Sequence, residues 1–226
     1  MNISVKKIVL IAVSVLIVIG IVLAVCLAPR NRKYDEAEVK AAATALIKAS
    51  VMLNDIYYGK GIRYLEYSEN NVSPYCEADP THLEELGFRT IAELKAKTKE
   101  VFSTAHAESM FASTFKGMGT SQMSRYYQHY DDNKADKKPL YIMVYKEYEP
   151  LMNGEMVYDF NTLKVIDSKG EYVNATIDAT VVYGEKTQTH TLNLILIEEE
   201  SGWRLACTTF AKYYEGMDKY DELQKG

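Results

Sequence analysis

The feature that most constrains this chain is an uncharged, almost entirely apolar run of 21 residues near its start, from Ile8 to Ala28. The run contains no charged residue and one glycine, Gly20. As an α-helix it would be about 31 Å long at ~1.5 Å per residue, which matches a hydrocarbon core of ~30 Å. We therefore expect a single transmembrane helix, with residues 1–33 as anchor and short flanks and residues 34–226 as one folded domain beside the membrane.

Two alternatives to an uncleaved anchor stay open, a cleaved signal peptide and a lipid-attached cysteine. A signal peptide has a shorter apolar stretch of roughly 7–15 residues and a small-x-small cleavage site. Residues 26–28 are the best-placed such site, but Pro29 follows them and is a poor residue just after a scissile bond. Lipid attachment at Cys26 is disfavoured because Val25 stands where a small residue is expected. These features favour an anchor.

The numbers of basic residues on the two sides of the run are nearly equal, so they give little preference for either membrane orientation. Lys6 and Lys7 precede it, and Arg30, Arg32 and Lys33 follow it. A short polar head before the span resembles a signal anchor, which exports the C-terminal domain. We expect a single-pass protein of the cytoplasmic membrane with an extracytoplasmic domain; a cytoplasmic domain is the alternative.

The domain itself is strongly acidic. All 31 acidic residues follow residue 33, whereas five of the 26 basic residues lie within residues 1–33, so the part from Tyr34 onward carries a net charge of −10. Nucleic-acid binding depends on basic patches, so we expect no nucleic-acid partner. A neutral or basic protein partner fits this charge better, although the charge also serves plain solubility.

The first half of the domain has the spacing of amphipathic helices. From Asp35 to Tyr57, apolar residues recur three or four positions apart. Shorter helices are expected over residues 79–87, from the capping box at Thr90 to about Phe102, and over residues 103–117.

From Pro139 onward the apolar period changes to two, which is typical of strands. The expected strands are Leu140 to Tyr148, Tyr158 to Asp167, Glu171 to Tyr183, Thr187 to Glu198 and Trp203 to Phe210. Short turns join the later ones into a meander. The expected fold class is therefore α+β, with three or four helices packed on one curved antiparallel sheet.

The two cysteines outside the apolar run are expected to differ in setting. Cys76 is expected in a loop, and Cys207 on a strand face shared with Trp203 and Leu205, where it would be a buried thiol. A disulfide between Cys76 and Cys207 stays open as an alternative.

No catalytic signature is apparent in the sequence. Residues 106–108 have the H-x-E spacing of zinc deaminases, but the P-C-x-x-C that completes that signature is missing. The four histidines are scattered, and no G-x-S-x-G or phosphate-loop motif occurs. We expect a protein that is not an enzyme and binds no metal or cofactor.

Tyrosine is the outlier of the composition, with 18 of 226 residues. Tyr126, Tyr127 and Tyr130 fall in the polar stretch from Met118 to Lys138, which we expect to be a long exposed connection. Tyrosine combines a rigid apolar ring with a polar tip, which suits recognition surfaces. We therefore take these three as candidate binding residues; the alternative is that they line the boundary between sheet and helices.

Several short motifs and the order of elements resemble known bacterial families over roughly residues 40–210. The motifs are Gly-Ile-Arg-Tyr at 61–64, Thr-Ile-Ala-Glu-Leu at 90–94, Val-Phe-Ser at 101–103, Lys-Pro-Leu-Tyr at 138–141 and Ser-Gly-Trp-Arg-Leu at 201–205. They resemble secreted proteins related to DL-endopeptidase inhibitors of cell-wall hydrolases. The plan is also similar to NTF2-like domains, which fold helices against a curved sheet into a cone and commonly end in a Gly-Trp-Arg hairpin.

The resemblance implies a membrane-anchored, extracytoplasmic domain that binds an envelope protein. The most specific form of this hypothesis is that the domain inhibits a wall hydrolase by inserting residues 118–138 into the cleft of that enzyme. Membrane-anchored NTF2-like domains also occur as subunits of conjugation machines, so a structural subunit of an envelope-spanning secretion or conjugation complex is an alternative. A small-ligand site between helices and sheet is a third expectation. No functional residue is carried over from either family.

Overall fold

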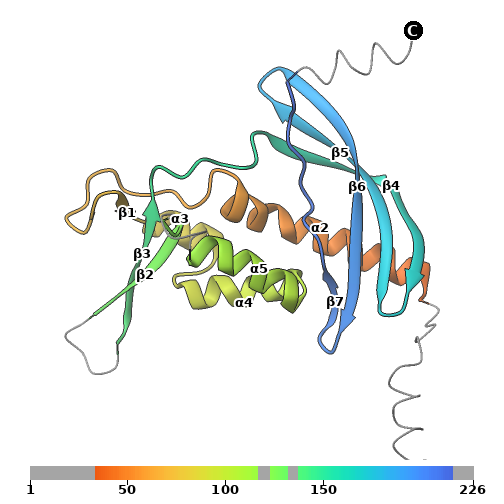
Figure 1. Ribbon diagram of the computed structural model, residues 1–226, viewed down its shortest axis with the longest axis horizontal. Coiled ribbons are helices and arrows are strands. Elements are labelled where there is room, and N and C mark those ends of the chain that lie inside the picture. The colour runs from red at the N-terminus through yellow and green to blue at the C-terminus, as the bar shows by residue number, and fades with distance from the viewer. Residues whose placement is uncertain (1–33, 117–122, 132–136, 216–226) are drawn as a thin grey trace, which may run out of the picture.

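The computed structural model describes residues 34–116, 123–131 and 137–215, and over these residues the fold is α+β (Figure 1). The helices are α2 (Glu36–Tyr58), α3 (Pro80–Leu86), α4 (Ile91–Val101) and α5 (Thr104–Phe115). The apolar run at residues 8–28 lies outside this part of the chain. Within the described ranges, no helix is both long and apolar enough to cross a bilayer.

The strands form two separate antiparallel sheets. The smaller sheet has the order β1-β3-β2, built from Tyr75–Glu77, Pro139–Tyr145 and Tyr126–Tyr130 respectively. The larger has the order β4-β5-β6-β7, built from Glu155–Lys169, Tyr172–Tyr183, Lys186–Glu199 and Gly202–Leu205.

Side-chain caps begin the helices where the sequence predicts them. Asp35 accepts a hydrogen bond from the backbone N–H of Ala37 at the start of α2. Thr90 and Glu93 form the predicted capping box of α4, and Ser103 caps α5. These caps satisfy N–H groups that have no partner inside the helix, so each helix start is fixed locally.

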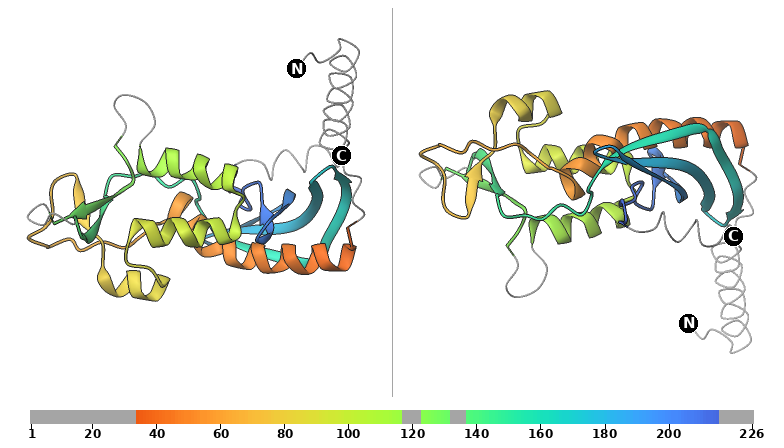
Figure 2. Two further views of the ribbon diagram at one scale, coloured as in Figure 1. Left: turned by 90° about the horizontal axis from the view of Figure 1, so that it is seen from below. Right: turned by 90° about the horizontal axis from the view of Figure 1, so that it is seen from above.

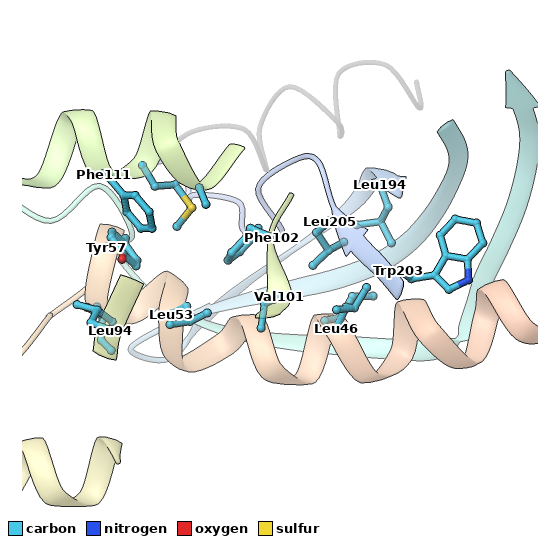
Figure 3. Close-up of a cluster of buried hydrophobic side chains, with 14 of the residues drawn as sticks. Leu46, Leu53, Tyr57, Leu94, Val101, Phe102, Phe111, Leu194, Trp203 and Leu205 are labelled. Atoms are coloured by element: carbon cyan, nitrogen blue, oxygen red, sulfur yellow. The ribbon is translucent and has the colours of Figure 1, made fainter. Parts of the chain in front are cut away.

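The core extends from the space between α2 and the four-stranded sheet to the space between α2, α4 and α5 (Figures 1 and 3). Alternate residues of β5, from Val173 to Val181, are buried, as the period of two predicts. Leu46 of α2 lies beneath Leu205 and Leu194 of the sheet in Figure 3, whereas Leu53 lies farther along the helix, nearer to Phe102. The apolar face of the helix and the apolar face of the sheet therefore cover each other.

The prediction of a single sheet is wrong, because β3 does not join the C-terminal meander. It pairs instead with β1 and β2, so that Cys76 lies opposite Val144 and Tyr127 opposite Met143. Both β1 and β2 are short and lie in segments whose sequence is typical of loops. Their pairing with β3 therefore cannot be recognised from local periodicity. β7 also ends at Leu205 rather than Phe210.

The expected exposed connection from Met118 to Lys138 is interrupted by β2. Tyr126–Tyr130 forms a strand of the smaller sheet, so the prediction of one continuous loop is wrong there. Residues 117–122 and 132–136 of this stretch lie outside the described part of the chain.

The two cysteines are both free, so the disulfide left open by the sequence is absent. Cys76 is buried in β1 rather than placed in a loop. Cys207 lies just beyond β7 and is only partly buried; its sulfur accepts a hydrogen bond from the backbone N–H of Ile195 at 3.2 Å.

The two sheets lie at opposite ends of the molecule (Figures 1 and 2). α2 begins at the end that holds the four-stranded sheet, where Tyr34 packs edge-on against Trp203 with ring centroids 4.9 Å apart. The indole N–H of Trp203 donates to Glu38 at 3.1 Å. The 23 residues of α2 span about 34 Å at ~1.5 Å per residue, so the helix separates the start of the domain from the smaller sheet.

Candidate functional site

Tyr126, one of the three tyrosines singled out by the sequence, lies in the core rather than on a recognition surface. Its side chain is fully buried. Its hydroxyl donates to the carbonyl oxygen of Ile56 at 2.8 Å and accepts from the N–H of Ile62 at 3.1 Å. Burial raises the pKa of Tyr126 to about 12. The alternative interpretation, that such residues line an internal boundary, holds for this tyrosine.

Tyr127 points to the other side of the strand, because successive residues of β2 alternate between the faces of the sheet. It joins three further tyrosines on this outer face, and we call the four the tyrosine face: Tyr75, Tyr127, Tyr141 and Tyr145. Tyr75 contacts Tyr127 edge-on at 4.8 Å and Tyr145 at 5.5 Å between ring centroids. The cluster draws one strand residue from β1, one from β2 and two from β3.

The tyrosine face is built as a fixed platform. Met143 lies at its centre and is almost fully buried. The hydroxyl of Tyr75 donates to the carbonyl oxygen of Ser124 at 2.8 Å, and that of Tyr141 donates to the side chain of Asn70 at 3.2 Å. The ring of His129 stacks on Tyr141 at 4.8 Å. These contacts hold the rings in place before any partner arrives, which lowers the entropic cost of binding.

Further apolar and aromatic side chains are exposed at the same end of the molecule. We call them the tip residues; they lie in the smaller sheet or in the loop that leads to β1, and they are Tyr64, Tyr67, Val72, Tyr130 and Leu140. Tyr67 is 96% exposed, and exposed Glu66 and Glu69 lie on either side of it. Tyr130 is 43% exposed, so of the three tyrosines predicted from sequence it is the one most open to a partner.

Arg125 is a residue that the sequence analysis missed. It directly precedes β2 and is only 3% exposed. Its Nη2 donates to the carbonyl oxygen of Gly59 at 2.7 Å, and the guanidinium carbon lies 3.9 Å from the ring centroid of Tyr148. A single arginine in a polar stretch usually indicates an exposed side chain, so no sequence signal marked it as buried.

The histidines do not come together in space. Across the described ranges, no group of three or more histidine, cysteine and acidic side chains is arranged to hold a metal ion. His106 lines an open cavity of about 600 Å³ between the start of α5 and strands β5 and β6. Burial lowers the pKa of His106, and its Nε2 is buried without a hydrogen-bond partner among the described residues.

The end of the molecule farthest from the start of α2 thus carries the preorganised rings of the tyrosine face and the exposed side chains of the tip residues. Aromatic side chains of this kind dominate the energetics of protein interfaces. When the chain is compared with known family models and with curated protein sequences, nothing matches.

Proposed function

We propose that this chain is a membrane-anchored, extracytoplasmic domain that binds an envelope protein through the tyrosine face and the tip residues, without catalysing a reaction. The observation that carries the proposal is the position of this surface at the end of α2, about 34 Å from the start of the helix at ~1.5 Å per residue. With residues 8–28 in the membrane, the surface would be held away from the lipid and toward partners.

The resemblance to DL-endopeptidase inhibitors supports the sharper form of this proposal, inhibition of a wall hydrolase. In this form the β2–β3 hairpin, rather than a continuous loop, meets the enzyme. The packing of α2 on a four-stranded antiparallel sheet supports an NTF2-like plan for that part of the domain. The smaller sheet is then an addition to that plan, and it carries the recognition surface.

The test is an inhibition assay with the full chain in detergent micelles. A DL-endopeptidase is added to purified cell walls, and the release of peptide fragments is followed with increasing amounts of the protein. We expect saturable inhibition. The double variant Tyr67→Ala/Tyr130→Ala is expected to weaken it at least roughly tenfold, because truncation of an interface tyrosine often costs about 1–2 kcal/mol.

The control is Tyr172→Ala/Tyr214→Ala, which removes two exposed tyrosines outside the tyrosine face and the tip. This variant is expected to inhibit like the unchanged protein. Equal weakening by both double variants would reject the proposed surface. Full hydrolase activity at micromolar concentrations of the unchanged protein would reject the inhibitor form.

A structural subunit of an envelope-spanning complex is the second candidate, and the four-stranded sheet favours it. β4 is an edge strand of 15 residues, and Val157 and Ile166 on it are exposed. A long free edge is a template for pairing with another chain. Two register irregularities interrupt β4, which makes it a poorer template, so we rank this candidate second. Sedimentation of the full chain in detergent tests it, because a subunit of this kind is expected to self-associate.

A further inference from the structure

Arg125 is a buried cation with an incomplete set of partners. Its Nη2 is bonded to the carbonyl oxygen of Gly59, and the rings of Tyr148 and Tyr126 lie 3.9 Å and 5.3 Å from its guanidinium carbon. Among the residues that the structure describes, no carboxylate forms an ion pair with it. Its Nη1 is buried and has no hydrogen-bond partner within the same ranges.

Burying a charged guanidinium in this position costs desolvation free energy unless an anion forms an ion pair with it. Arginine is rarely buried to this degree without a charged partner, because the loss of hydration is large. One carbonyl oxygen and two ring faces compensate for only part of that loss. The arrangement therefore calls for an anion that is supplied from outside the described part of the chain.

The surroundings hold Arg125 in place for such a role. Its backbone N–H donates to the carbonyl oxygen of Thr114 at 2.8 Å, and its own carbonyl oxygen accepts from Tyr145 at 2.9 Å. Gly61 has a positive φ of 82°, and a Cβ there would lie 2.2 Å from Nη2. Only glycine at residue 61 leaves space for the guanidinium.

A cavity of about 310 Å³ adjoins the arginine. It lies between the ends of α2, α5 and β3, and its walls include Tyr57, Tyr58, Thr114, Tyr148 and Leu151. Sites for small ligands begin at volumes of roughly 300 Å³ and combine apolar walls with a few polar groups. The cavity has both properties.

The charges around the cavity narrow the chemistry of its ligand. A guanidinium matches the two oxygens of a carboxylate with two parallel hydrogen bonds. Exposed Glu147 and Glu149 also line the cavity, and they would repel a multiply charged anion while attracting an ammonium group. We propose that the cavity binds a small carboxylate that carries an amino group, a free amino acid or a short peptide, with its carboxylate on Arg125.

Entry of the ligand requires movement of one side chain, because Nη1 does not touch solvent. Tyr148 covers the guanidinium and lies outside the regular strand, since β3 ends at Tyr145. Its hydroxyl donates to the carbonyl oxygen of Tyr57 at 3.5 Å, the limit of a hydrogen bond. Rotation of this ring away from Arg125 would open Nη1 to the cavity.

The test is calorimetric titration of the full chain in detergent with four probes: glycine, the dipeptide Ala-Ala, its C-terminal amide and inorganic phosphate. We expect glycine or Ala-Ala to bind with saturation, and the amide and phosphate to bind at least tenfold more weakly. Binding of glycine alone would identify free amino acids as the ligand, and binding of Ala-Ala alone would identify peptides. Failure of both at millimolar concentration would overturn the inference.

Variants separate this site from general effects. Arg125→Met is expected to weaken binding at least tenfold, whereas Arg89→Met, at an exposed arginine, is expected to bind like the unchanged protein. Glu147→Gln/Glu149→Gln provides a second measurement, in case Arg125→Met does not fold. It is expected to weaken glycine binding severalfold; unchanged binding by this variant and by Arg125→Met would overturn the inference. The result does not depend on the proposed protein partner.

Discussion

The hydroxyl of Tyr126 and the carbonyl oxygen of Ile56, 70 residues apart in the chain, are joined by a hydrogen bond of 2.8 Å in the core. The same hydroxyl accepts from the N–H of Ile62. One side chain of β2 thereby satisfies two backbone groups just where α2 ends, and so fixes the smaller sheet to the helix.

Tyr126→Phe should therefore lower the free energy of unfolding by about 1–3 kcal/mol, because it leaves two buried backbone groups without a partner. Chemical denaturation of the full chain in detergent measures this change. The control is Tyr130→Phe, an exposed tyrosine in the same strand, for which a change below ~0.5 kcal/mol is expected. Equal stability of the two variants would show that water replaces the lost hydroxyl.

Leu205→Ala should lower the free energy of unfolding by about 2–5 kcal/mol. Leu205 is fully buried on the side of β7 that packs in the core, and its truncation leaves a cavity. The melting temperature followed by circular dichroism reports the loss. Leu140→Ala removes the same atoms from a half-exposed position and should change stability by less than about 0.5 kcal/mol. A small effect at Leu205 would contradict the described core.

Stability should fall as the pH drops through the range just below the ordinary histidine pKa of about 6.5. Burial lowers the pKa of His106 in the folded state, and it also lowers that of His82. The unfolded chain therefore binds a proton at a pH where the folded chain does not, which favours unfolding. His106→Gln should flatten this part of the pH profile in denaturation measured from pH 5 to 8, and an unchanged slope would reject the assignment to His106.

Both cysteines of the described domain should react slowly with iodoacetamide in the folded protein. Cys76 is buried, and burial raises the pKa of the Cys207 thiol, which lowers the fraction of reactive thiolate. Mass spectrometry after timed labelling should show rapid modification of both once denaturant is added. A mass lower by two hydrogens before reduction would instead indicate a disulfide.

Features set by nearby residues could be predicted from the sequence. The capping box at Thr90 and the spacing within α2 involve residues one to four positions apart, and both predictions are confirmed. The alternation in β5 is equally local, and it identified the buried face from Val173 to Val181 correctly.

Features that depend on pairing between segments far apart in the sequence could not be predicted from it. β1 has three residues and gains its stability from β3, nearly 70 positions later, so its own sequence carries no strand pattern. Tyr126 and Arg125 lie side by side in a polar stretch, yet both are buried, because the end of α2 covers them. Of the candidate site, the sequence identified the abundance of tyrosine, but not which rings face outward.

The contact of Tyr34 with Trp203 has a mechanical consequence. Because Trp203 also donates to Glu38, the first residues of the described domain are attached to β7 as well as to their own helix. A pulling force applied ahead of Tyr34 would be shared by the helix and the sheet from the outset. The first turn of α2 would then unfold under force only together with its contacts to β7, and not by local fraying alone.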